Sequence, residues 1–546
     1  MRVLGVNAVF HDSSAALVVD GRIVAAAEEE RFSRRKHAKR PVPFSAWELP
    51  EQAMRWCLEA GGISPADLDA VAYGFDPALA KAAEDMGLDD PWDHVRIEYA
   101  RRAPSFLAAA LPGLDAERVR FVAHHVAHAA SAALWARPAR SAVMALDGRG
   151  GRASALLGRY DDGRLEVLAT QDLPDSLGLV YEALTEHLGF ERSSDEYKVM
   201  ALASYGVPRF ADELRPYVRA GVAGGFVARV PDFARWVPRH PAGDGWSTDQ
   251  ADLAASVQRL VEDVLVELAR WLRGVTDEPA LTMAGGMALN CVASSRIWRE
   301  SGFDEVHVQP AAGDSGTALG AALQVAADAG DRIVRAPTAA LGRSWTDDEL
   351  ADVLRRARVG FETPRDLPQA VAAILAADGV VAWFDGRSEF GPRALGYRSL
   401  LAHPGFAENL GRLNEIKGRE QFRPVAPMVL EDDAPQIFSG GPLPSPYMLF
   451  VHDVDPAWRG RIPAVVHVDG TARVQTVDPA RQPRLGATLR AFRARTGLPV
   501  LVNTSLNTAG RPMVDRPRDA LELFGSSPVD VLVLGPHLVR RADLAR

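Results

Sequence analysis

The chain contains few cysteines and few lysines, and these two shortages limit which disulfide, metal and phosphate sites it can form. Two cysteines, Cys57 and Cys291, occur in 546 residues, both in apolar surroundings, which argues against a disulfide framework and a thiolate metal site. Any bound metal is therefore expected to use histidine and carboxylate ligands. Five of the 62 basic residues are lysines, so each lysine is a candidate for a place where a compact charge is preferred to a guanidinium, as at a phosphate, with a leftover surface lysine as the alternative.

Long apolar runs and an excess of positive charge are also missing. No apolar stretch approaches the roughly 20 residues of a membrane helix, so no membrane span is expected. The formal net charge of −9 disfavours binding to an extended phosphate backbone, which argues against nucleic acid as a partner. Residues 3–6 are apolar and no basic leader or cleavage site precedes them, which predicts a soluble, cytoplasmic protein.

A three-strand meander opens the chain, and the same pattern returns later. Strands are expected at residues 2–7, 14–19 and 22–27, and again at 142–146, 154–159 and 165–170. A duplicated meander followed by helices is typical of an actin-like ATPase (ASKHA) fold, in which two related halves hold a nucleotide. Two unrelated hairpins are the alternative.

Helices and strands alternate through residues 251–325, and the periodicity is lost over 327–344. We therefore predict a domain boundary near residue 340. The first domain would span residues 1–340, and the second, of α/β or α+β class, residues 341–546.

The alanine-rich run at residues 124–132 (HHVAHAASA) is expected to be helical. His124 and His128 then project from one face, a spacing that suits two imidazole ligands. With carboxylates they would form a site for Fe²⁺, Zn²⁺ or Mn²⁺, and the ligand set does not choose among these metals. Candidate carboxylates are Asp147, in the second meander's turn, and Asp314, which could equally be a helix N-cap. Core or nucleotide-contacting histidines are the alternative.

Two turns of the first domain carry further polar candidates. His11 and Asp12 lie in the first turn, where His11 could act as a general base for a hydroxyl or be a solvent-exposed histidine. The segment 285–290 (GGMALN) follows an expected strand and opens a helix. Its glycines either let backbone amides approach a phosphate or serve strand-helix packing.

Two lysines of the first domain are phosphate candidates. Lys198 heads the apolar run 196–203, where it could meet a nucleotide phosphate. Lys36 lies in the basic cluster 33–37, which suits phosphate or forms a solvated face.

The second domain contains the densest basic cluster. Residues 386–424 hold seven basic residues against four glutamates, in loops that glycine and proline rigidify. Forked guanidinium donors on such loops suit polyphosphate. Segments 467–475 and 502–507 add short polar side chains that suit a small carbonyl ligand or a ribose, with plain turns as the alternative.

Several short motifs occur together in one order and resemble a known family. They are FHDSSAA (10–16), AEEER (27–31), HHVAHA (124–129), EYKVM (196–200), GGMALN (285–290), GPRALG (391–396), FRP (422–424) and NTSLN (503–507). Over essentially its whole length the chain resembles the O-carbamoyltransferases that decorate antibiotics, aminoglycosides and nodulation factors. The resemblance implies an N-terminal domain like threonylcarbamoyl-tRNA transferase and a C-terminal α/β domain like threonylcarbamoyl-adenylate synthase.

The resemblance also implies two half-reactions. Carbamoyl phosphate and ATP, with Mg²⁺, would give carbamoyl-adenylate and pyrophosphate in the C-terminal domain. In the N-terminal domain the carbamoyl group would pass to a hydroxyl of a small-molecule natural product, releasing AMP. Family precedent favours Fe²⁺ as the metal, with another divalent ion as an alternative. The acceptor and the oligomeric state stay open, a homodimer being one option.

Residue roles follow from the same resemblance. The catalytic residues would be His11, Asp12 and Lys198, and the metal ligands His124, His128, Asp147 and Asp314. The residues that bind nucleotide or carbamoyl phosphate would be Lys36, Gly285, Gly286, Asn290, Arg393, Lys417, Arg423, Arg473, Asn503 and Ser505.

Two other functions fit an actin-like fold. A small-molecule kinase would transfer the γ-phosphoryl group, and a non-catalytic switch would only bind nucleotide. Product analysis separates the three, since they yield AMP with a carbamoylated acceptor, ADP with a phosphorylated acceptor, or neither.

Overall fold

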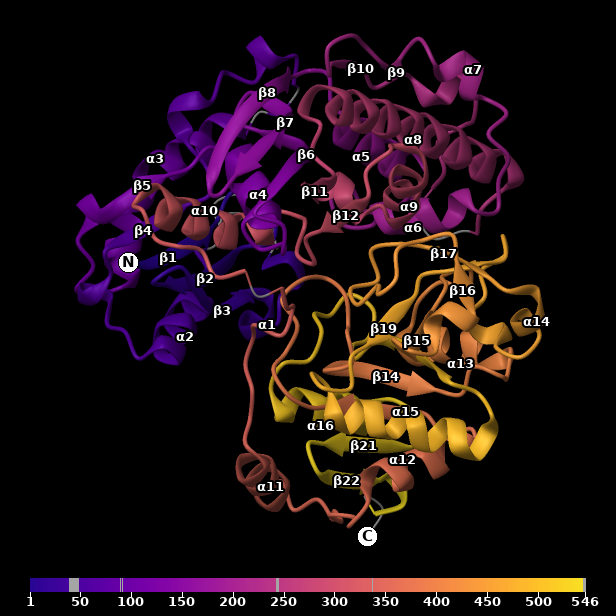
Figure 1. Ribbon diagram of the computed structural model, residues 1–546. Helices are drawn as coiled ribbons and strands as arrows, with labels where there is room; N and C mark the ends of the chain where they lie inside the picture. Colours follow the sequence, from indigo (N-terminus) through magenta and orange to yellow (C-terminus); the bar gives the residue numbers. More distant parts are fainter. Residues whose placement is uncertain (39–48, 89, 91, 242–244, 336, 544–546) are drawn as a thin grey trace. The chain divides into compact units, whose positions relative to one another are not determined.

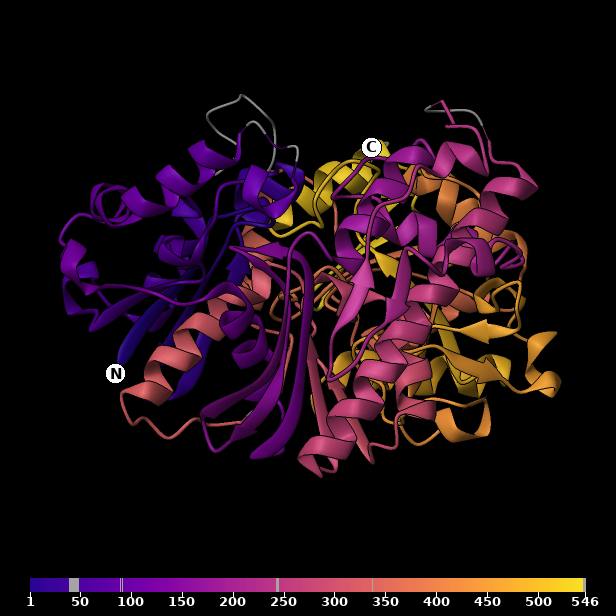
Figure 2. The ribbon, with the colours of Figure 1, turned by 90° about the horizontal axis from the view of Figure 1, so that it is seen from above.

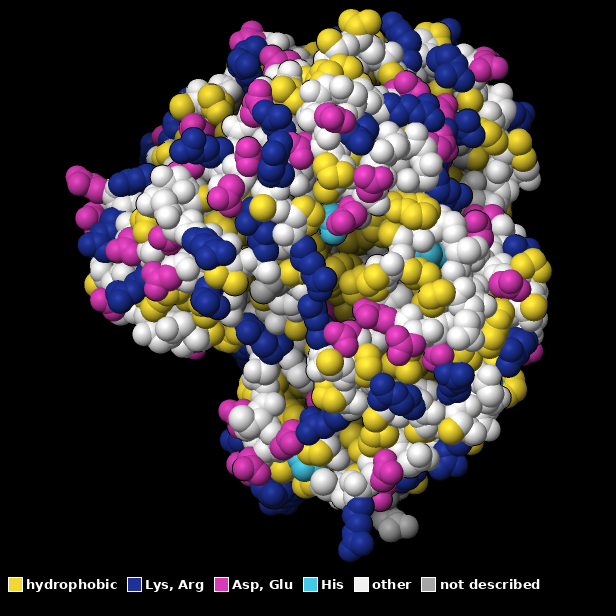
Figure 3. All heavy atoms as spheres, in the orientation of Figure 1, with side chains coloured by type: hydrophobic (Ala, Val, Ile, Leu, Met, Phe, Trp, Pro, Cys, Tyr) yellow, Lys and Arg dark blue, Asp and Glu magenta, His cyan; other side chains and the backbone are white. Residues whose placement is uncertain are grey.

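The computed structural model describes residues 1–38, 49–88, 90, 92–241, 245–335 and 337–543 (Figure 1). The chain divides into two compact units, Met1–Thr338 (unit 1) and Ala339–Arg546 (unit 2), next to the boundary predicted near residue 340. Within the described ranges, no helix is both long and apolar enough to cross a membrane. Charged side chains of both signs are mixed over the face that Figure 3 shows.

Unit 1 begins with a five-stranded sheet in the order β3-β2-β1-β4-β5. Its strands are β1 (Arg2–Asn7), β2 (Ser14–Val19), β3 (Arg22–Glu28), β4 (Ala70–Tyr73) and β5 (Val119–Phe121). The first three strands pair antiparallel, and β4 and β5 run parallel to β1. The helices around this sheet are α1 (Glu30–Ser33), α2 (Glu51–Gly61), α3 (Asp93–Ala110) and α4 (His124–Ala133).

The second sheet of unit 1 repeats this topology, in the order β12-β11-β6-β7-β8. Its strands are β6 (Arg140–Gly150), β7 (Ala153–Asp161), β8 (Arg164–Asp172), β11 (Ala280–Ala284) and β12 (Glu305–Val308). Again the first three are antiparallel and the last two run parallel to the first. The shared strand order is that of an actin-like ATPase, so the predicted fold class is confirmed.

The hairpins of both meanders turn at an Asp-Gly pair. Asp20 and Gly21 have φ values of 48° and 71°, and Asp162 and Gly163 have 45° and 93°. Two consecutive residues with positive φ give the tight turn whose twist matches that of the strands, and Asp-Gly tolerates this conformation well. The turn residues therefore set the register of both meanders.

Further helices and a small two-stranded sheet complete unit 1. They are α5 (Leu177–His187), α6 (Glu196–Ala203), α7 (Ala211–Leu214), β9 (Val218–Ala220), β10 (Phe226–Ala228), α8 (Thr248–Thr276), α9 (Cys291–Glu300) and α10 (Ser315–Asp328). The 29-residue helix α8 starts at a capping box formed by Ser247 and Gln250.

The last helix of unit 1 leaves the second sheet and covers the first. Helix α10 follows β12 in the chain but packs against β1, β2 and α4, and Figure 2 shows it alongside the indigo strands. Glycine allows this close approach, because a Cβ on Gly5 would lie 1.8 Å from the carbonyl oxygen of Ala318. A Cβ on Gly320 of α10 would lie 1.8 Å from the carbonyl oxygen of Ala127 in α4. Helix α4 in turn packs against β6 and β11 of the second sheet.

Unit 2 is built on a seven-stranded mixed sheet in the order β19-β15-β20-β14-β13-β21-β22. Its strands are β13 (Val381–Phe384), β14 (Arg398–Ala402), β15 (Ala426–Leu430), β19 (Gln475–Val477), β20 (Val500–Ser505), β21 (Val531–Leu534) and β22 (His537–Arg540). The helices are α11 (Asp347–Arg356), α12 (Leu367–Ala376), α13 (Glu408–Lys417), α14 (Pro456–Arg459), α15 (Pro483–Thr496) and α16 (Pro517–Ser526). A three-stranded sheet holds β16 (Phe438–Ser439), β17 (His452–Val454) and β18 (Thr471–Ala472).

Candidate functional site

Four predicted metal ligands of unit 1 converge on one buried point. His124 and His128 lie on α4, and their Nε2 atoms are 3.1 Å apart. Asp147 of β6 places Oδ2 at 3.3 and 3.2 Å from these two nitrogens. Asp314 places Oδ1 at 3.6 and 3.5 Å from them. One ligand atom from each of the four residues lies within 4.8 Å of every other.

Close backbone contacts fix the orientation of these ligands. The Nδ1 atom of His124 lies 3.2 Å from the Gly74 carbonyl oxygen and can donate to it, which leaves Nε2 toward the cluster. A Cβ on Gly150 would lie 2.5 Å from the His124 ring, so the second sheet reaches this ring only because residue 150 is glycine. The Gly286 amide donates to Oδ1 of Asp147 at 3.1 Å, which turns Oδ2 toward the histidines.

The alternative role of Asp314 as a helix cap is not used. Asp314 occupies the N-cap position of α10, but its side chain makes no capping hydrogen bond. Its carboxylate lies at the histidines instead. Helix α10 therefore delivers one acidic ligand, and α4 delivers the two imidazoles.

The cluster has unusual protonation energetics. Burial opposes a charge on His124, but the hydrogen bonds to Asp147 and Asp314 outweigh it and raise the pKa of His124 to about 10. The same opposition raises the pKa of His128. Burial alone would raise the pKa of Asp147, but the two histidines hold it well below its usual range. Positive charge is thus strongly favoured between the two carboxylates.

The donor set fits a divalent transition metal. Two imidazole nitrogens and two carboxylate oxygens are ligands for Fe²⁺, Zn²⁺ or Mn²⁺. Two Nε2 atoms at 3.1 Å share no more than a proton without such an ion, whereas a cation would satisfy all four ligands at once.

A second cluster lies in the first turn of unit 1. The Nδ1 atom of His11 is 2.7 Å from Oδ2 of Asp12, and the Nδ1 atom of His37 is 2.8 Å from Oδ1. These three side chains also offer a possible set of cation ligands. The turn reaches the histidine-carboxylate cluster through Phe10, whose ring centroid lies 5.7 Å from that of His124. His37 was not singled out from the sequence, where it is the last residue of a basic run.

The two candidate lysines of unit 1 meet at the start of α6. The ammonium of Lys198 is 2.9 Å from Oδ2 of Asp195. The ammonium of Lys36 lies 5.9 Å from the centre of the Tyr197 ring, one residue before Lys198. The structure therefore brings both lysines to one helix start, and their contact with phosphate stays a prediction.

The segment 285–290 is held by tight packing. Gly285 has φ of +88°, and a Cβ there would lie 1.9 Å from the Leu146 carbonyl oxygen, which supports the packing alternative for this glycine. Asn290 caps α9 through the Ala293 amide and exchanges hydrogen bonds of 2.9 and 3.1 Å with Gln258. Nucleotide binding by Gly285, Gly286 and Asn290 stays a prediction.

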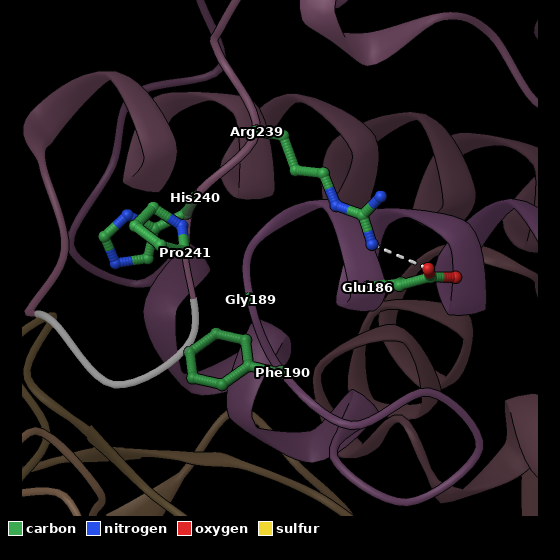
Figure 4. A pocket seen from close by; sticks show the side chains of 6 residues that line it. All are labelled: Glu186, Gly189, Phe190, Arg239, His240 and Pro241. Carbon is green, nitrogen blue, oxygen red and sulfur yellow. Dashed lines mark hydrogen bonds and ion pairs between the residues drawn. The ribbon is translucent and has the colours of Figure 1, made fainter.

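A cavity of about 410 Å³ lies past the end of α5 (Figure 4). Its lining residues are Glu186, Gly189, Phe190, Arg239, His240 and Pro241. Arg239 and Glu186 form an ion pair of 2.7 Å at one side. The Phe190 ring also lies 5.5 Å from the Lys198 ammonium, so this cavity borders the start of α6. No sequence pattern indicated it.

Unit 2 gathers its predicted residues at one edge of its large sheet. Strands β14 and β15 both run antiparallel to β20, so the segments that precede them lie at the end where β20 finishes. Strand β19 runs parallel to β15 and begins at the same end. Arg393 precedes β14, Arg423 precedes β15, Arg473 precedes β19, and Ser505 ends β20. Segments far apart in sequence thus meet at one sheet edge.

Lys417 and Asn503 form hydrogen bonds with neighbouring residues at this edge of the sheet. The Lys417 ammonium donates to Oγ of Ser505 at 3.0 Å and to Oδ1 of Asn507 at 2.6 Å. The Asn503 amide donates to the Ala394 carbonyl at 3.0 Å, beside Arg393. Its buried Oδ1 has no hydrogen-bond partner among the described residues and is therefore left for a donor.

Comparison with known proteins identifies the family. The family described as carbamoyltransferase N-terminus matches residues 2–222 and 238–323, and carbamoyltransferase C-terminus matches residues 372–541. The chain belongs to the carbamoyltransferase family. The resemblance predicted from the motifs is thereby confirmed, and so is carbamoyl transfer as the enzyme class, in place of a kinase or a switch.

Relatives of this carbamoyltransferase match nearly the whole chain. The nodulation protein NolNO of Sinorhizobium fredii is 35% identical over 98% of this chain and 80% of its own length. An uncharacterised protein of Synechocystis is 36% identical over 97% of this chain and 95% of its own. Among solved structures, full-length HypF in the phosphate- and nucleotide-bound form is 15% identical, with a TM-score of 0.37 over 61% of this chain and 56% of its own. The fold assignment rests on the strand order.

Proposed function

We propose that this carbamoyltransferase works in two half-reactions, one in each unit. In unit 2, carbamoyl phosphate and ATP, supplied with Mg²⁺, give carbamoyl-adenylate and pyrophosphate. In unit 1, the carbamoyl group passes from the adenylate to a hydroxyl of a small-molecule natural product, such as an antibiotic or another secondary metabolite, and AMP leaves. An acyl phosphate anhydride is a far more reactive donor than a carbamate, and a protein site limits its loss to water.

The observation that carries this proposal is the arginine-lined sheet edge of unit 2. Carbamoyl transfer at the histidine-carboxylate cluster of unit 1 alone would not need Arg393, Arg423 and Arg473 at a separate place. Guanidinium forks are suited to phosphate oxygens, and two anionic substrates, ATP and carbamoyl phosphate, must meet before an adenylate can form. The partnerless Oδ1 of Asn503 and the hydroxyl of Ser505 supply neutral polar contacts at the same edge.

Unit 1 supplies the transfer site in this proposal. His124, His128, Asp147 and Asp314 would hold a divalent metal, with Fe²⁺ as the first choice. When bound, such an ion supplies positive charge that a phosphate oxygen of the adenylate can share. Lys198, on α6, and Lys36, whose ammonium lies 5.9 Å from the centre of the Tyr197 ring of that helix, would bind the same phosphate or its neighbours.

The first half-reaction can be tested without knowing the acceptor. The purified protein is incubated with ATP, Mg²⁺ and carbamoyl phosphate, and products are followed by mass spectrometry. We expect carbamoyl-adenylate and pyrophosphate, both absent when carbamoyl phosphate is omitted. ATP left intact, or converted only to ADP, would contradict the two-step proposal.

A further inference from the structure

Glu389, a buried residue of unit 2, binds the loop that carries Arg393. Glu389 is 1% exposed, and its Oε1 atom accepts hydrogen bonds from three main-chain amides. They are those of Leu395 at 2.7 Å, Tyr397 at 3.0 Å and Arg398 at 3.1 Å. The second oxygen, Oε2, is buried and has no hydrogen-bond partner among the described residues, so these three amides supply the hydrogen bonds of the carboxylate.

The main chain on both sides of Glu389 is fixed as well. The Ser388 amide donates to the Arg343 carbonyl oxygen at 2.9 Å, and the Phe390 amide donates to the Ala339 carbonyl oxygen at 2.7 Å. The carboxylate is therefore presented from a fixed position, and the loop is fitted to it.

Side chains from three strands bind further peptide groups of residues 394–398. They are Asn503 of β20 on the Ala394 carbonyl at 3.0 Å, Gln475 of β19 on the Leu395 carbonyl at 2.9 Å, and Ser399 of β14 on the Gly396 amide at 3.0 Å. Five consecutive residues are thus bound by four side chains, three of which come from elsewhere in the sequence. Such support from behind is what holds a functional group in a precise place.

The amides of this loop are not available to a ligand. In a glycine-rich phosphate loop the main-chain amides point at the phosphate, whereas here Glu389 occupies three of them. The guanidinium of Arg398 is buried and donates to main-chain carbonyl oxygens. A substrate phosphate is therefore left to the half-buried Arg393 as the basic side chain of this loop.

We propose, resting on the two-step function above, that Glu389 is a positioning residue for carbamoyl-adenylate formation. Its carboxylate sets the conformation of residues 394–398 and thereby directs the Arg393 guanidinium toward a phosphate of the bound substrate. Glu389 itself does not touch the substrate.

Glu389→Leu tests this role, because it leaves three buried amides without their acceptor. We expect kcat/KM for pyrophosphate release to fall by about 10²-fold, the usual cost of a small misplacement. We also expect KM for carbamoyl phosphate or ATP to rise several-fold, whereas partial unfolding alone would lower kcat and leave KM unchanged. Glu522→Leu, an exposed change on α16, should keep the wild-type values. Unchanged KM values for both substrates in Glu389→Leu overturn the proposal.

Two conservative variants separate the hydrogen bonds of Glu389 from its charge, and they carry the test if Glu389→Leu does not fold. Glu389→Gln keeps an oxygen for the three amides and loses the charge, so kcat/KM should stay within about threefold of wild type. Glu389→Asp keeps the charge but is one methylene short, so a loss of about tenfold is expected. A larger loss in Glu389→Gln than in Glu389→Asp overturns the proposal.

A double variant tests whether Glu389 acts through Arg393. In an Arg393→Ala background, Glu389→Leu should lower kcat/KM little further, because the group that it positions is already absent. Losses that multiply would show that the two residues act independently, which also overturns the proposal.

Hydrogen exchange followed by mass spectrometry tests the structural part without any substrate. A peptide spanning residues 390–399 should exchange faster in Glu389→Leu and at the wild-type rate in Glu389→Gln. Wild-type exchange in Glu389→Leu overturns the proposal even if activity falls. If wild-type protein forms no carbamoyl-adenylate, the two-step function fails and the role of Glu389 in it fails too. If wild-type protein is active and Glu389→Leu is equally active, only the role of Glu389 fails.

Discussion

Unit 1 concentrates carboxylates and imidazoles at a buried point, whereas in unit 2 three arginines lie in segments that lead into strands at one edge of a sheet. In unit 1 the four candidate ligand atoms lie within 4.8 Å of one another. Burial lowers the local dielectric constant and so strengthens the electrostatic interactions among these groups. In unit 2 Arg393, Arg423 and Arg473 come from three separate segments around a strand end. One arrangement attracts a compact cation, and the other suits extended anionic substrates. A single chain thus carries two clusters of opposite charge type, one rich in carboxylates and one rich in arginines.

We expect the largest effect from Asp147→Asn, which should impair unit 1 and leave unit 2 unchanged. Removing one of the two carboxylates leaves the cluster short of negative charge, so the metal should be lost, and transfer from supplied carbamoyl-adenylate should fall by about 10³-fold. Pyrophosphate release in unit 2 should not change. Metal content by mass spectrometry and single-turnover transfer check this, with the exposed Asp304→Asn as control. Metal retained at the wild-type level would contradict the assignment.

Gly285→Ala tests how far the packing of unit 1 depends on a glycine at the turn after β11. A Cβ would lie 1.9 Å from the Leu146 carbonyl oxygen on a backbone with φ of +88°, so the turn must shift. We expect a destabilisation of about 3 kcal/mol in the unfolding transition of unit 1. Thermal or urea unfolding measures it. Gly274→Ala, within α8 with open space at its Cβ, should be neutral or stabilising; equal effects of the two changes would contradict this account.

Arg423→Ala is the corresponding test in unit 2. Loss of a charge-assisted contact to substrate phosphate should lower carbamoyl-adenylate formation by about 10- to 10²-fold, while transfer from supplied adenylate is unchanged. Pyrophosphate release is the measurement, and the exposed Arg518→Ala serves as control. Normal pyrophosphate release from Arg423→Ala would refute the placement of the first half-reaction in unit 2.

The smallest expected effect concerns pH and His467. Burial, together with the charge of Arg473, lowers the pKa of His467 to about 4. Between pH 6.5 and 4 the unfolded chain therefore binds a proton that the folded chain does not, so the free energy of unfolding falls as the pH falls through this window. We expect a contribution of about 1 kcal/mol. Urea unfolding at pH 7 and 4.5 should show a shallower loss for His467→Asn; identical losses would contradict it.

The sequence predicts the part of the fold that local pattern controls. The strands predicted at residues 2–7 and 14–19 have the observed bounds, because both are apolar runs and the Asp20-Gly21 turn follows the second. Strands β14, β15 and β19 of unit 2 were not predicted. They are short, and their positions depend on pairing with β20, which is distant in sequence, so no local periodicity marks them.

The candidate site was likewise predictable only where local spacing brings its residues together. The i, i+4 spacing of His124 and His128 predicted a shared face, and the structure brings both to Asp147 and Asp314. The choice between a cap and a ligand for Asp314 depended on where α10 packs, which no local pattern contains. His37 was missed because its partner Asp12 lies 25 residues away, beyond any turn or helix period. Tertiary contacts therefore decided which of several polar residues belong together.

Because α10 crosses to the first sheet, each half of unit 1 depends on the other for folding. A piece that ends before β6 would contain both histidine ligands but would expose the face of β1 and β2 that α10 covers. It would also lack Asp314, and the complementary piece would carry α10 with nothing to pack on. Although the two halves of unit 1 repeat one topology, we expect neither half to be expressible alone. Co-expression of both pieces should be needed to recover a folded, metal-binding unit.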